Sequence, residues 1–358
     1  MKGLFINNSE KKDSIHISGV MVYECLKSSK KFSIDYLEVD INNRQISAEY
    51  DFYLFNYHPA TMHWLDTRSL RKYLKNVGTV ILEVLPNDPF VLCPARHFDY
   101  YCVLDPTIKS KKNIYSFPRP LDKFEGELPV VHNQTPVVGT FGFATKGKGF
   151  QHVVDAVNKE FDKAVIRINI PYGDFVPDSK EYAAFLADVC KKRAKPGVEV
   201  IVTNDFMDKD ELINWCACNT LNCFLYDRDM PGLSATTDQA IVSGRPLSVS
   251  NNDTFRHITH YLTPYPAWSL KDAIEKSIPV VRQMQQDWTQ EAFASKFEKL
   301  LSEKVVKRQF NSSMITLPLK EYTFLDAIRK RVKKYTRKIK KFFKANKKIP
   351  SAKTKEII

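Results

Sequence analysis

Residues 232–246 combine small and hydroxyl-bearing side chains in a pattern suited to binding an anion. They read Gly-Leu-Ser-Ala-Thr-Thr-Asp-Gln-Ala-Ile-Val-Ser-Gly-Arg-Pro, which predicts a short helix over 237–243. The first turn of such a helix has N–H groups without an internal partner and carries partial positive charge. We therefore expect a phosphate to bind beside Leu233, Ser234, Thr236 and Thr237. The alternative is an ordinary capped helix that a Gly and a Pro end.

A second glycine-rich segment lies about 90 residues upstream, over 139–150. It follows a predicted strand and precedes a predicted helix, and its glycines permit a tight turn and close approach to a ligand. Gly142 marks the turn, and Lys146 and Lys148 supply positive charge for a diphosphate. The segment matches neither a Walker loop nor the GxGxxG pattern of dinucleotide-binding folds. By itself it is therefore a weak signal.

Basic residues near the first stretch form another group of candidates. Arg228 precedes the predicted helix start closely enough to reach a diphosphate, and Arg256 and His257 follow the next predicted strand. The alternative for Arg228 is an ordinary surface arginine. We expect all three to line one pocket.

Four residues in the first half of the chain are candidates for the opposite side of a cleft. Ser18 and Gly19 precede a predicted helix over 20–26, and His58 follows a predicted strand. Glu83 lies within a strongly β-branched predicted strand. Each candidate has a structural alternative. Ser18 and Gly19 can form a plain helix start, His58 can be a structural histidine at a strand end, and Glu83 can be a half-exposed acid in a strand.

Strands and helices alternate twice along the chain, which is typical of parallel sheets covered by helices. The first half predicts strands over 2–8, 33–39, 51–57, 79–85, 100–104 and 113–117, with helices over 20–26 and 65–75. The second predicts strands over 137–141, 164–170, 198–203, 222–226 and 246–249, and helices over 150–161, 179–192, 208–216, 237–243 and 288–301. A proline-rich linker over 118–136 separates them. We predict an α/β protein with Rossmann-like domains over 1–125 and 126–305 and an extension over 306–358.

Length and composition agree with two cytoplasmic globular domains. The chain of 358 residues is too long for one ordinary hydrophobic core, and 43% of its residues are hydrophobic. No apolar run reaches the roughly 20 residues of a membrane span, and the N-terminus resembles a strand rather than a signal peptide. Cys216, Cys218 and Cys223 fit no common zinc pattern, so we expect buried thiols in a reducing cytosol and no metal.

Positive charge is concentrated at the C-terminal end. Residues 320–358 hold 15 Lys or Arg and three Asp or Glu, a net +12 of the chain's +13. Apolar residues recur at helical spacing within this segment, namely Leu325, Ile328, Val332, Tyr335, Ile339 and Phe342. A basic amphipathic helix over 322–348 that lies on an anionic membrane surface is therefore predicted. The alternative is a helix that packs across the first domain, and nucleic acid is not expected to bind.

Taken together, the two anion-binding segments resemble the donor domain of GT-B glycosyltransferases, in particular the retaining nucleotide-sugar group (glycosyltransferase family 4/1-like). Gly142 and Lys148 have the family's spacing of six. Gln239-Ala240, followed by Gly244-Arg245-Pro246, is similar to its glutamate-containing helix. The likeness covers residues 137–305, including the Asp287-Trp288 pair, and 1–120 in outline.

The resemblance implies two Rossmann-like domains facing across a cleft and a nucleotide diphosphate sugar bound without metal by the second domain. Gly142, Lys146, Lys148 and the amides near Ser234 would hold the diphosphate, and Gln239 or Asp238 the ribose. Two departures concern the donor. Phe143 replaces the family's arginine, and Pro231 and Gln239 replace its paired glutamates.

The predicted activity is transfer of a sugar, with retained configuration, to a glycan or lipid-linked acceptor near Ser18, Gly19 and His58. Lys148, His58 and Arg228 are the predicted catalytic residues. The basic extension suggests surface polysaccharide or glycolipid assembly at the cytoplasmic face of a membrane. The alternatives are a non-catalytic GT-B module that binds a nucleotide or glycan and, more distantly, a GT-B epimerase or phosphorylase-like enzyme.

Overall fold

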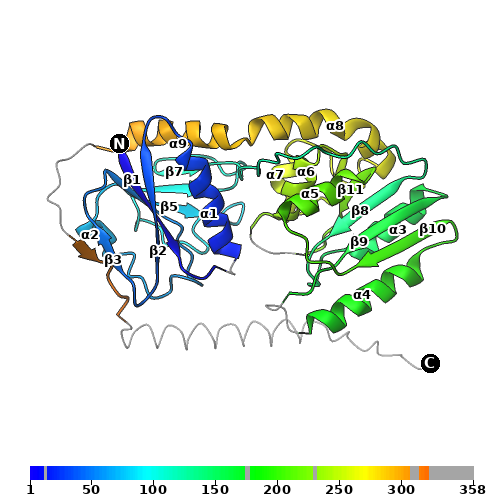
Figure 1. The fold of residues 1–358 in the computed structure, drawn as a ribbon, viewed down its shortest axis with the longest axis horizontal. Helices are drawn as coiled ribbons and strands as arrows, with labels where there is room; N and C mark the ends of the chain where they lie inside the picture. Colours follow the sequence, from blue (N-terminus) through cyan, green and yellow to red (C-terminus); the bar gives the residue numbers. More distant parts are fainter. Residues whose placement is uncertain (12–13, 174–177, 229–231, 307–313, 322–358) are drawn as a thin grey trace, which may run out of the picture.

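The computed structural model describes residues 1–11, 14–173, 178–228, 232–306 and 314–321. They form two α/β lobes, with the N-terminal strands in one and residues from 137 to about 287 in the other (Figure 1). The predicted basic helix over 322–348 lies outside the described residues. None of the described helices is both long and apolar enough to cross a membrane.

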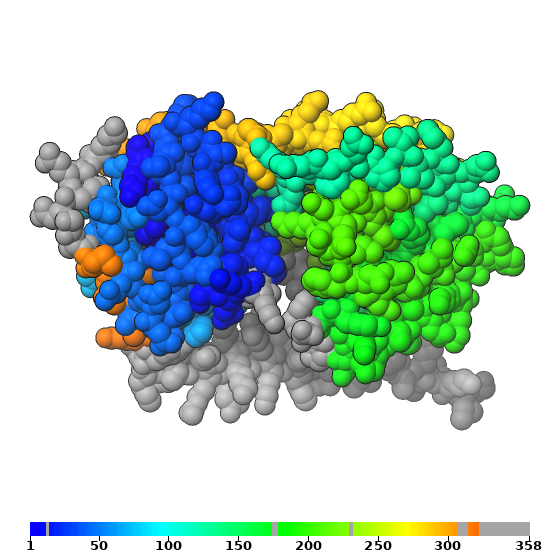
Figure 2. Space-filling model, in the orientation of Figure 1, coloured from blue at the N-terminus to red at the C-terminus, as the bar shows by residue number. Residues whose placement is uncertain are grey.

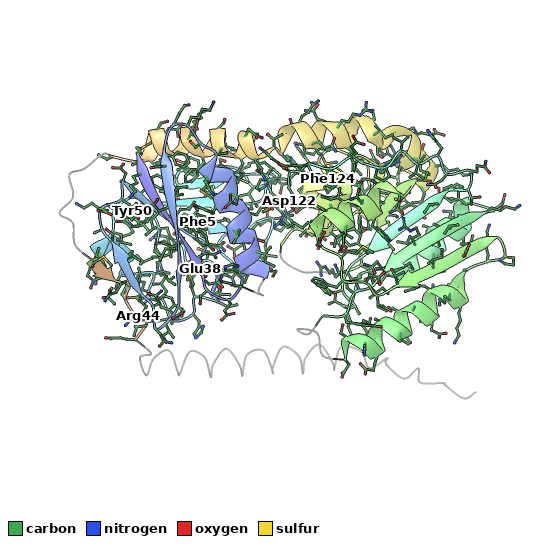
Figure 3. The ribbon with its side chains drawn as sticks, in the orientation of Figure 1. Phe5, Glu38, Arg44, Tyr50, Asp122 and Phe124 are labelled. Carbon is green, nitrogen blue, oxygen red and sulfur yellow. The ribbon has the colours of Figure 1, made fainter. Side chains whose placement is uncertain are left out.

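The first lobe is built on a six-stranded parallel sheet in the order β2-β1-β4-β5-β6-β7. Its strands are β1 (Lys2–Asn8), β2 (Ser33–Val39), β4 (Phe52–Phe55), β5 (Val77–Ile81), β6 (Tyr100–Val103) and β7 (Ile114–Ser116), and its helices are α1 (Ser14–Lys27) and α2 (Leu70–Tyr73). Most strand positions are buried, as expected when both faces of a parallel sheet are covered. Phe5 lies in this core (Figure 3).

The second lobe holds a five-stranded parallel sheet in the order β10-β9-β8-β11-β12. Its strands are β8 (Val137–Phe141), β9 (Ala164–Asn169), β10 (Val198–Thr203), β11 (Leu221–Phe224) and β12 (Leu247–Val249). Its helices are α3 (Phe150–Glu160), α4 (Ser179–Arg193), α5 (Lys209–Ala217), α6 (Thr236–Val242), the 3-10 helix η1 (Asp253–Phe255), α7 (Arg256–Thr259) and α8 (Leu270–Asp287). The strand order reverses at β8, and ligands bind at the carboxyl end of such a switch point.

The helix predicted over 288–301 corresponds to α9 (Gln290–Lys304), whereas α8 before it is not among the predicted helices. Helix α8 ends at Asp287, and α9 begins after Thr289, whose hydroxyl accepts from the Ala292 N–H. The two run in succession over both lobes (Figure 1). Phe293 and Phe297 of α9 pack into the core of the first lobe, so this helix returns the chain to the N-terminal sheet.

Three predictions on element bounds are wrong. Helix α2 has four residues where 65–75 was expected, and β5 ends at Ile81, so Glu83 lies in the loop beyond the strand. Helix α1 begins at Ser14, which places Ser18 and Gly19 inside the helix rather than at its start. These bounds depend on packing against the sheet, which local propensity does not report.

A small sheet that the sequence did not predict holds the end of the described chain. Strand β13 (Met314–Thr316) pairs antiparallel with β3 (Gln45–Ser47) of the first lobe. Leu317 is fully buried there, and its carbonyl accepts a hydrogen bond from the Arg44 guanidinium at 2.8 Å. Residues 314–317 are therefore attached to the N-terminal lobe.

The packing of α9 leads to a stability prediction. Phe297 is fully buried, and its ring lies 5.7 Å from that of Phe32 and 5.9 Å from that of Phe52. We expect Phe297→Ala to lower the free energy of unfolding of the N-terminal lobe by about 3–5 kcal/mol, because it leaves a cavity. Urea denaturation followed by circular dichroism measures this. The exposed Glu303→Ala on the same helix is the control, and equal stability of both variants would contradict the packing role.

Candidate functional site

The carboxyl ends of the strands in both sheets face the space between the two lobes. Figure 2 shows a hollow between the N-terminal lobe in blue and the C-terminal lobe in green. The backbone N–H of Gly232 donates to the carbonyl of Val84 at 3.3 Å. Arg256 donates to that same carbonyl at 3.0 Å and to the Asp105 carboxylate at 2.8 Å. Asp105 is 1% exposed, so a nearly buried ion pair joins the lobes.

The loop between β8 and α3 is held tightly against the segment after β11. Gly142, Gly147 and Gly149 all have positive φ, at 143°, 78° and 67°. A Cβ on Gly149 would lie 1.8 Å from the Leu225 carbonyl oxygen, and one on Gly147 would lie 2.4 Å from the Arg228 Cβ. Only glycine fits at either position, which explains their place in the sequence.

This packing brings Lys148 and Arg228 together around Tyr226. The Lys148 ammonium donates to the Tyr226 hydroxyl at 2.8 Å, and it lies beside Gly142, where a Cβ would be 3.0 Å away. The Arg228 guanidinium lies 5.2 Å from the centre of the Tyr226 ring. Three predicted site residues, Gly142, Lys148 and Arg228, thus meet at the switch point. Tyr226 was missed, and an aromatic residue at the end of the predicted 222–226 strand was the available signal.

Hydroxyl groups from the second segment complete this cluster. The Thr236 hydroxyl lies 2.9 Å from the Tyr226 hydroxyl and 2.7 Å from that of Ser234. Thr237 is fully buried, and its hydroxyl donates to the Ser234 carbonyl, so it holds the backbone in place rather than facing a ligand. Burial would raise the pKa of Tyr226, but Lys148 and the hydroxyls bring that pKa below its ordinary value.

The structure does not support the prediction that Asp238 could bind the donor ribose. The Asp238 carboxylate accepts a hydrogen bond from Arg119 of the linker at 2.9 Å, and its side chain is 5% exposed. Burial raises the pKa of this carboxyl despite the charge of Arg119. It is therefore a link between α6 and the linker and is not placed to bind ribose. Gln239 is half-buried and is the remaining candidate for that role.

Two residues predicted separately, His58 and Glu83, form a pair beyond the carboxyl ends of the central strands β4 and β5. The His58 Nδ1 accepts from the Ala60 N–H at 3.1 Å, and its Nε2 lies 3.7 Å from the Glu83 carboxylate. That Nε2 is buried and makes no hydrogen bond to any described residue. A Cβ on Gly232 would lie 3.2 Å from the Glu83 Cγ. This acid–base pair therefore lies against Gly232, at the start of the 232–246 segment.

Ser18 and Gly19 do not form the expected loop facing a phosphate. A Cβ on Gly19 would lie 2.4 Å from the Asn56 side-chain nitrogen and 2.6 Å from that of Asn7. Both asparagines are fully buried at strand ends, so Gly19 is needed for close packing of α1 on the sheet. Ser18 is half-buried on the same helix.

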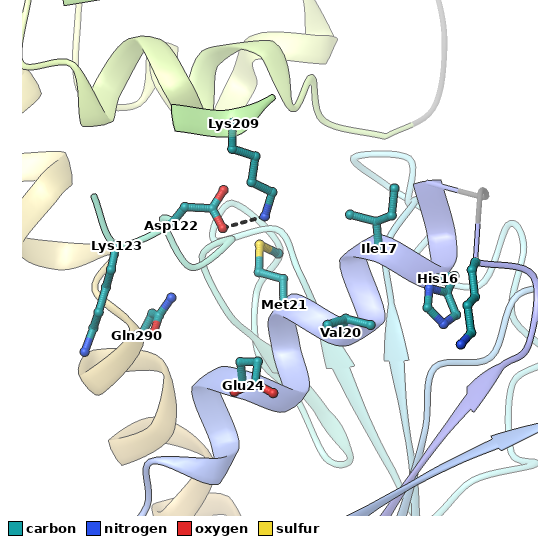
Figure 4. A pocket seen from close by; sticks show the side chains of 10 residues that line it. His16, Ile17, Val20, Met21, Glu24, Asp122, Lys123, Lys209 and Gln290 are labelled. Atoms are coloured by element: carbon teal, nitrogen blue, oxygen red, sulfur yellow. Dashed lines mark hydrogen bonds and ion pairs between the residues drawn. The ribbon is translucent and has the colours of Figure 1, made fainter. Parts of the chain in front are cut away.

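A groove of about 430 Å³ lies between α1, the linker and α5 (Figure 4). Ile17, Val20 and Met21 of α1 line one side of it. Opposite them, the Lys209 ammonium of α5 donates to the Asp122 carboxylate of the linker at 2.7 Å. The other lining residues are Lys11, His16, Glu24, Lys123 and Gln290. The groove can therefore hold a ligand with both apolar and polar parts.

Lys146 and Leu233 lie at the margins of the cluster. Lys146 is exposed and, with Lys148, lines a cavity of about 370 Å³ between the glycine-rich loop and α4. Leu233 is half-buried beside Ser234.

His257 does not line the pocket as expected. It is 1% exposed, and its ring stacks on Trp288 at 5.7 Å. Burial, together with the charges of Arg119 and Arg256, lowers the pKa of His257 to about 3. Only Arg256 of this pair contacts the other lobe.

Comparison with known proteins agrees with this architecture. No protein-family model matches the chain, and no curated protein matches its sequence. Among solved structures, HepE from Anabaena in complex with UDP has a TM-score of 0.57 at 11% identity, covering 85% of this chain and 100% of HepE. The chain has the GT-B fold.

Two other GT-B structures align over similar lengths. A glycosyltransferase from Rickettsia africae has a TM-score of 0.56 at 10% identity, covering 84% of this chain and 98% of that one. The lipopolysaccharide outer core galactosyltransferase WaaB has a TM-score of 0.55 at 11% identity, covering 85% and 100%. The predicted fold of two facing Rossmann-like lobes is confirmed.

The buried His257 leads to a prediction on pH dependence. The unfolded chain takes up a proton on this residue near pH 6.5, whereas the folded chain resists protonation down to about pH 3. Stability from this residue is therefore fully present above about pH 6.5 and falls as the pH drops through that window. We expect wild type to lose stability relative to His257→Gln by about 1.4 kcal/mol per pH unit between pH 6 and 4.

Urea unfolding at pH 7, 6, 5 and 4 measures this difference. The exposed His260→Gln is the matched control and should follow the wild-type curve. Parallel curves for wild type and His257→Gln would contradict the buried neutral state.

Proposed function

We propose that this protein is a glycosyltransferase that binds a nucleoside diphosphate sugar at the carboxyl edge of its second sheet. The observation that supports this most directly is the cluster of Lys148, Arg228, Ser234 and Thr236, which two distant segments bring together at the strand-order switch point. HepE, which has the same fold, was solved with UDP and with UDP-glucose. That likeness supports a nucleotide sugar as the donor.

The cluster suits a diphosphate because it combines fixed positive charge with hydroxyl and amide donors. During sugar transfer, negative charge builds on the departing diphosphate, and preorganised donors stabilise that charge. Lys148 and Arg228 supply the charge, with Lys146 at the solvent side, and the α6 start supplies N–H groups. These groups take the place of a metal in the proposed reaction.

We assign the ribose to Gln239 because Asp238 is engaged with Arg119. An amide binds ribose hydroxyls more weakly than a carboxylate does. The donor site therefore depends more on the diphosphate contacts than a site with the family's paired glutamates would.

The acceptor enters from the first lobe in this proposal. The His58–Glu83 pair lies against Gly232, where it can orient an acceptor hydroxyl toward the sugar. The resemblance implies that the sugar keeps its anomeric configuration. In that case the acceptor hydroxyl oxygen forms a bond to the sugar on the same face from which the diphosphate departs. The hydroxyl proton passes to the departing phosphate oxygen. The groove beside Ile17, Val20 and Met21 suits a glycan or lipid-linked acceptor with an apolar portion.

The basic extension suggests where the enzyme works. Strand β13 attaches residues 314–316 to the N-terminal lobe, so the extension starts from the lobe that we assign to the acceptor. The net charge of +12 over residues 320–358 favours an anionic surface. We therefore propose peripheral membrane association in the cytoplasm, with a role in surface polysaccharide or glycolipid assembly.

A non-catalytic GT-B module is the second candidate. Phe143 in place of an arginine, Pro231 and Gln239 in place of glutamates, and the Arg119–Asp238 link all remove donor contacts. Calorimetry with a panel of nucleoside diphosphate sugars tests donor binding, and release of nucleoside diphosphate tests turnover. Binding without turnover on any acceptor would favour the module, and no binding of any nucleoside diphosphate sugar would contradict the glycosyltransferase and a nucleotide-binding module.

We expect Lys148→Ala to reduce turnover of the true donor by about 100-fold, because it removes a charge-assisted contact in the transition state. Release of nucleoside diphosphate measures turnover. Lys163→Ala, an exposed lysine just before β9, is the control and should match wild type. Unchanged turnover in Lys148→Ala would exclude it from the reaction.

Deleting residues 322–358 should abolish binding to vesicles that contain phosphatidylserine while the two lobes stay folded. The deletion removes about 1 kcal/mol of binding free energy for each basic residue that lies near the anionic surface. Co-sedimentation measures binding, with phosphatidylcholine vesicles and circular dichroism as controls. Equal binding by the full and truncated chains would contradict the membrane role of the segment.

A further inference from the structure

Four polar groups form a continuous hydrogen-bonded chain that joins the two anion-binding segments. The Lys148 ammonium, the Tyr226 hydroxyl, the Thr236 hydroxyl and the Ser234 hydroxyl follow one another at 2.8, 2.9 and 2.7 Å. Lys148 is 8% exposed, and Tyr226 and Ser234 are each 3% exposed. Water therefore competes little with these bonds, and each group depends on its neighbours for partners.

The chemistry of Lys148 fixes the direction of the first bond in the chain. An ammonium can only donate, so the Tyr226 oxygen accepts from Lys148. In the next two bonds, between Tyr226 and Thr236 and between Thr236 and Ser234, either hydroxyl can be the donor. Without the phenol oxygen, Lys148 and Thr236 would lose the group that aligns them.

The surroundings of the ring strengthen this arrangement. The Lys148 ammonium lies 4.5 Å from the centre of the Tyr226 ring and the Arg228 guanidinium 5.2 Å from it. Two cations thus gather at one aromatic ring, where the electron-rich face attracts them. The lowered pKa of the Tyr226 phenol, caused mainly by Lys148 against the effect of burial, agrees with strong coupling between the two.

We propose that Tyr226 is a positioning residue, whose hydroxyl holds Lys148 for the donor diphosphate and orients the Thr236 and Ser234 hydroxyls toward it. This proposal rests on the proposed nucleotide-sugar site. Tyr226 itself makes no contact with the donor. Its effect is on phosphate recognition and not on recognition of the base.

The first test measures binding of UDP, GDP and ADP, each beside its nucleoside, by calorimetry. Tyr226→Phe keeps the ring and removes the hydroxyl. We expect it to weaken binding of the preferred nucleoside diphosphate by about tenfold and to leave nucleoside binding unchanged. Tyr261→Phe is the matched control, because it also removes a phenol that donates to a polar partner, the Asp287 carboxylate, in the same lobe. Diphosphate affinity in Tyr226→Phe equal to that of the control would overturn the proposal.

A second variant keeps the test decisive if Tyr226→Phe fails to fold. Thr236→Val interrupts the same chain on the α6 side while leaving the Lys148–Tyr226 bond intact. It should also weaken diphosphate binding without an effect on the nucleoside. Unchanged binding in this variant would show that the hydroxyls are not oriented through the chain.

A spectroscopic test needs no donor and so separates this proposal from the proposed function. Ionisation of tyrosine is followed by ultraviolet absorbance as the pH rises. In Lys148→Met, one tyrosine should ionise at higher pH than in wild type, and this difference should vanish in the Tyr226→Phe background. If wild type binds no nucleotide but the tyrosine shifts as expected, the donor site fails and the coupling stands. No shift would overturn the coupling itself.

Discussion

The arrangement of the candidate site depends on one nearly buried ion pair between the lobes. Arg256 of α7 binds the Asp105 carboxylate and the Val84 carbonyl, both at strand ends of the first sheet. A buried charge whose partner is removed is strongly destabilising, so this contact favours one relation between the lobes. With it in place, Gly232 meets Val84 and the His58–Glu83 pair lies against Gly232, at the start of the 232–246 segment.

Close backbone packing provides the second constraint. Glycines at 147 and 149 let the loop after β8 lie directly on the segment after β11. That contact places Lys148 on Tyr226 and, through Tyr226, beside the hydroxyls that precede α6. Positive charge comes from Lys148 and Arg228, while the position that holds an arginine in the resembled family is Phe143. The proposed donor site therefore takes its positive charge from positions other than the one that holds the arginine in the resembled family.

Much of the fold could be predicted, because the alternation of apolar strands and helices is a local pattern. The errors occur where distant segments meet. Helix α9 joins the first lobe because Phe293 and Phe297 fill its core, and β13 exists only as the partner of β3. The local sequence of neither element indicates which distant element it contacts. The short α2 and the early end of β5 likewise reflect packing that a single segment does not encode.

The sequence by itself determined two parallel sheets, the linker between them and two glycine-containing segments at strand ends, because strand periodicity and glycine spacing are properties of neighbouring residues. Only the tertiary structure decided which polar groups face the cleft. Glu83 reaches it beside His58, whereas Asp238 is bound by Arg119, 119 residues away. Tyr226 gained its place between Lys148 and Thr236 in the same way. A carboxylate or a phenol has a role only once its partners are known, and here those partners come from distant segments of the chain.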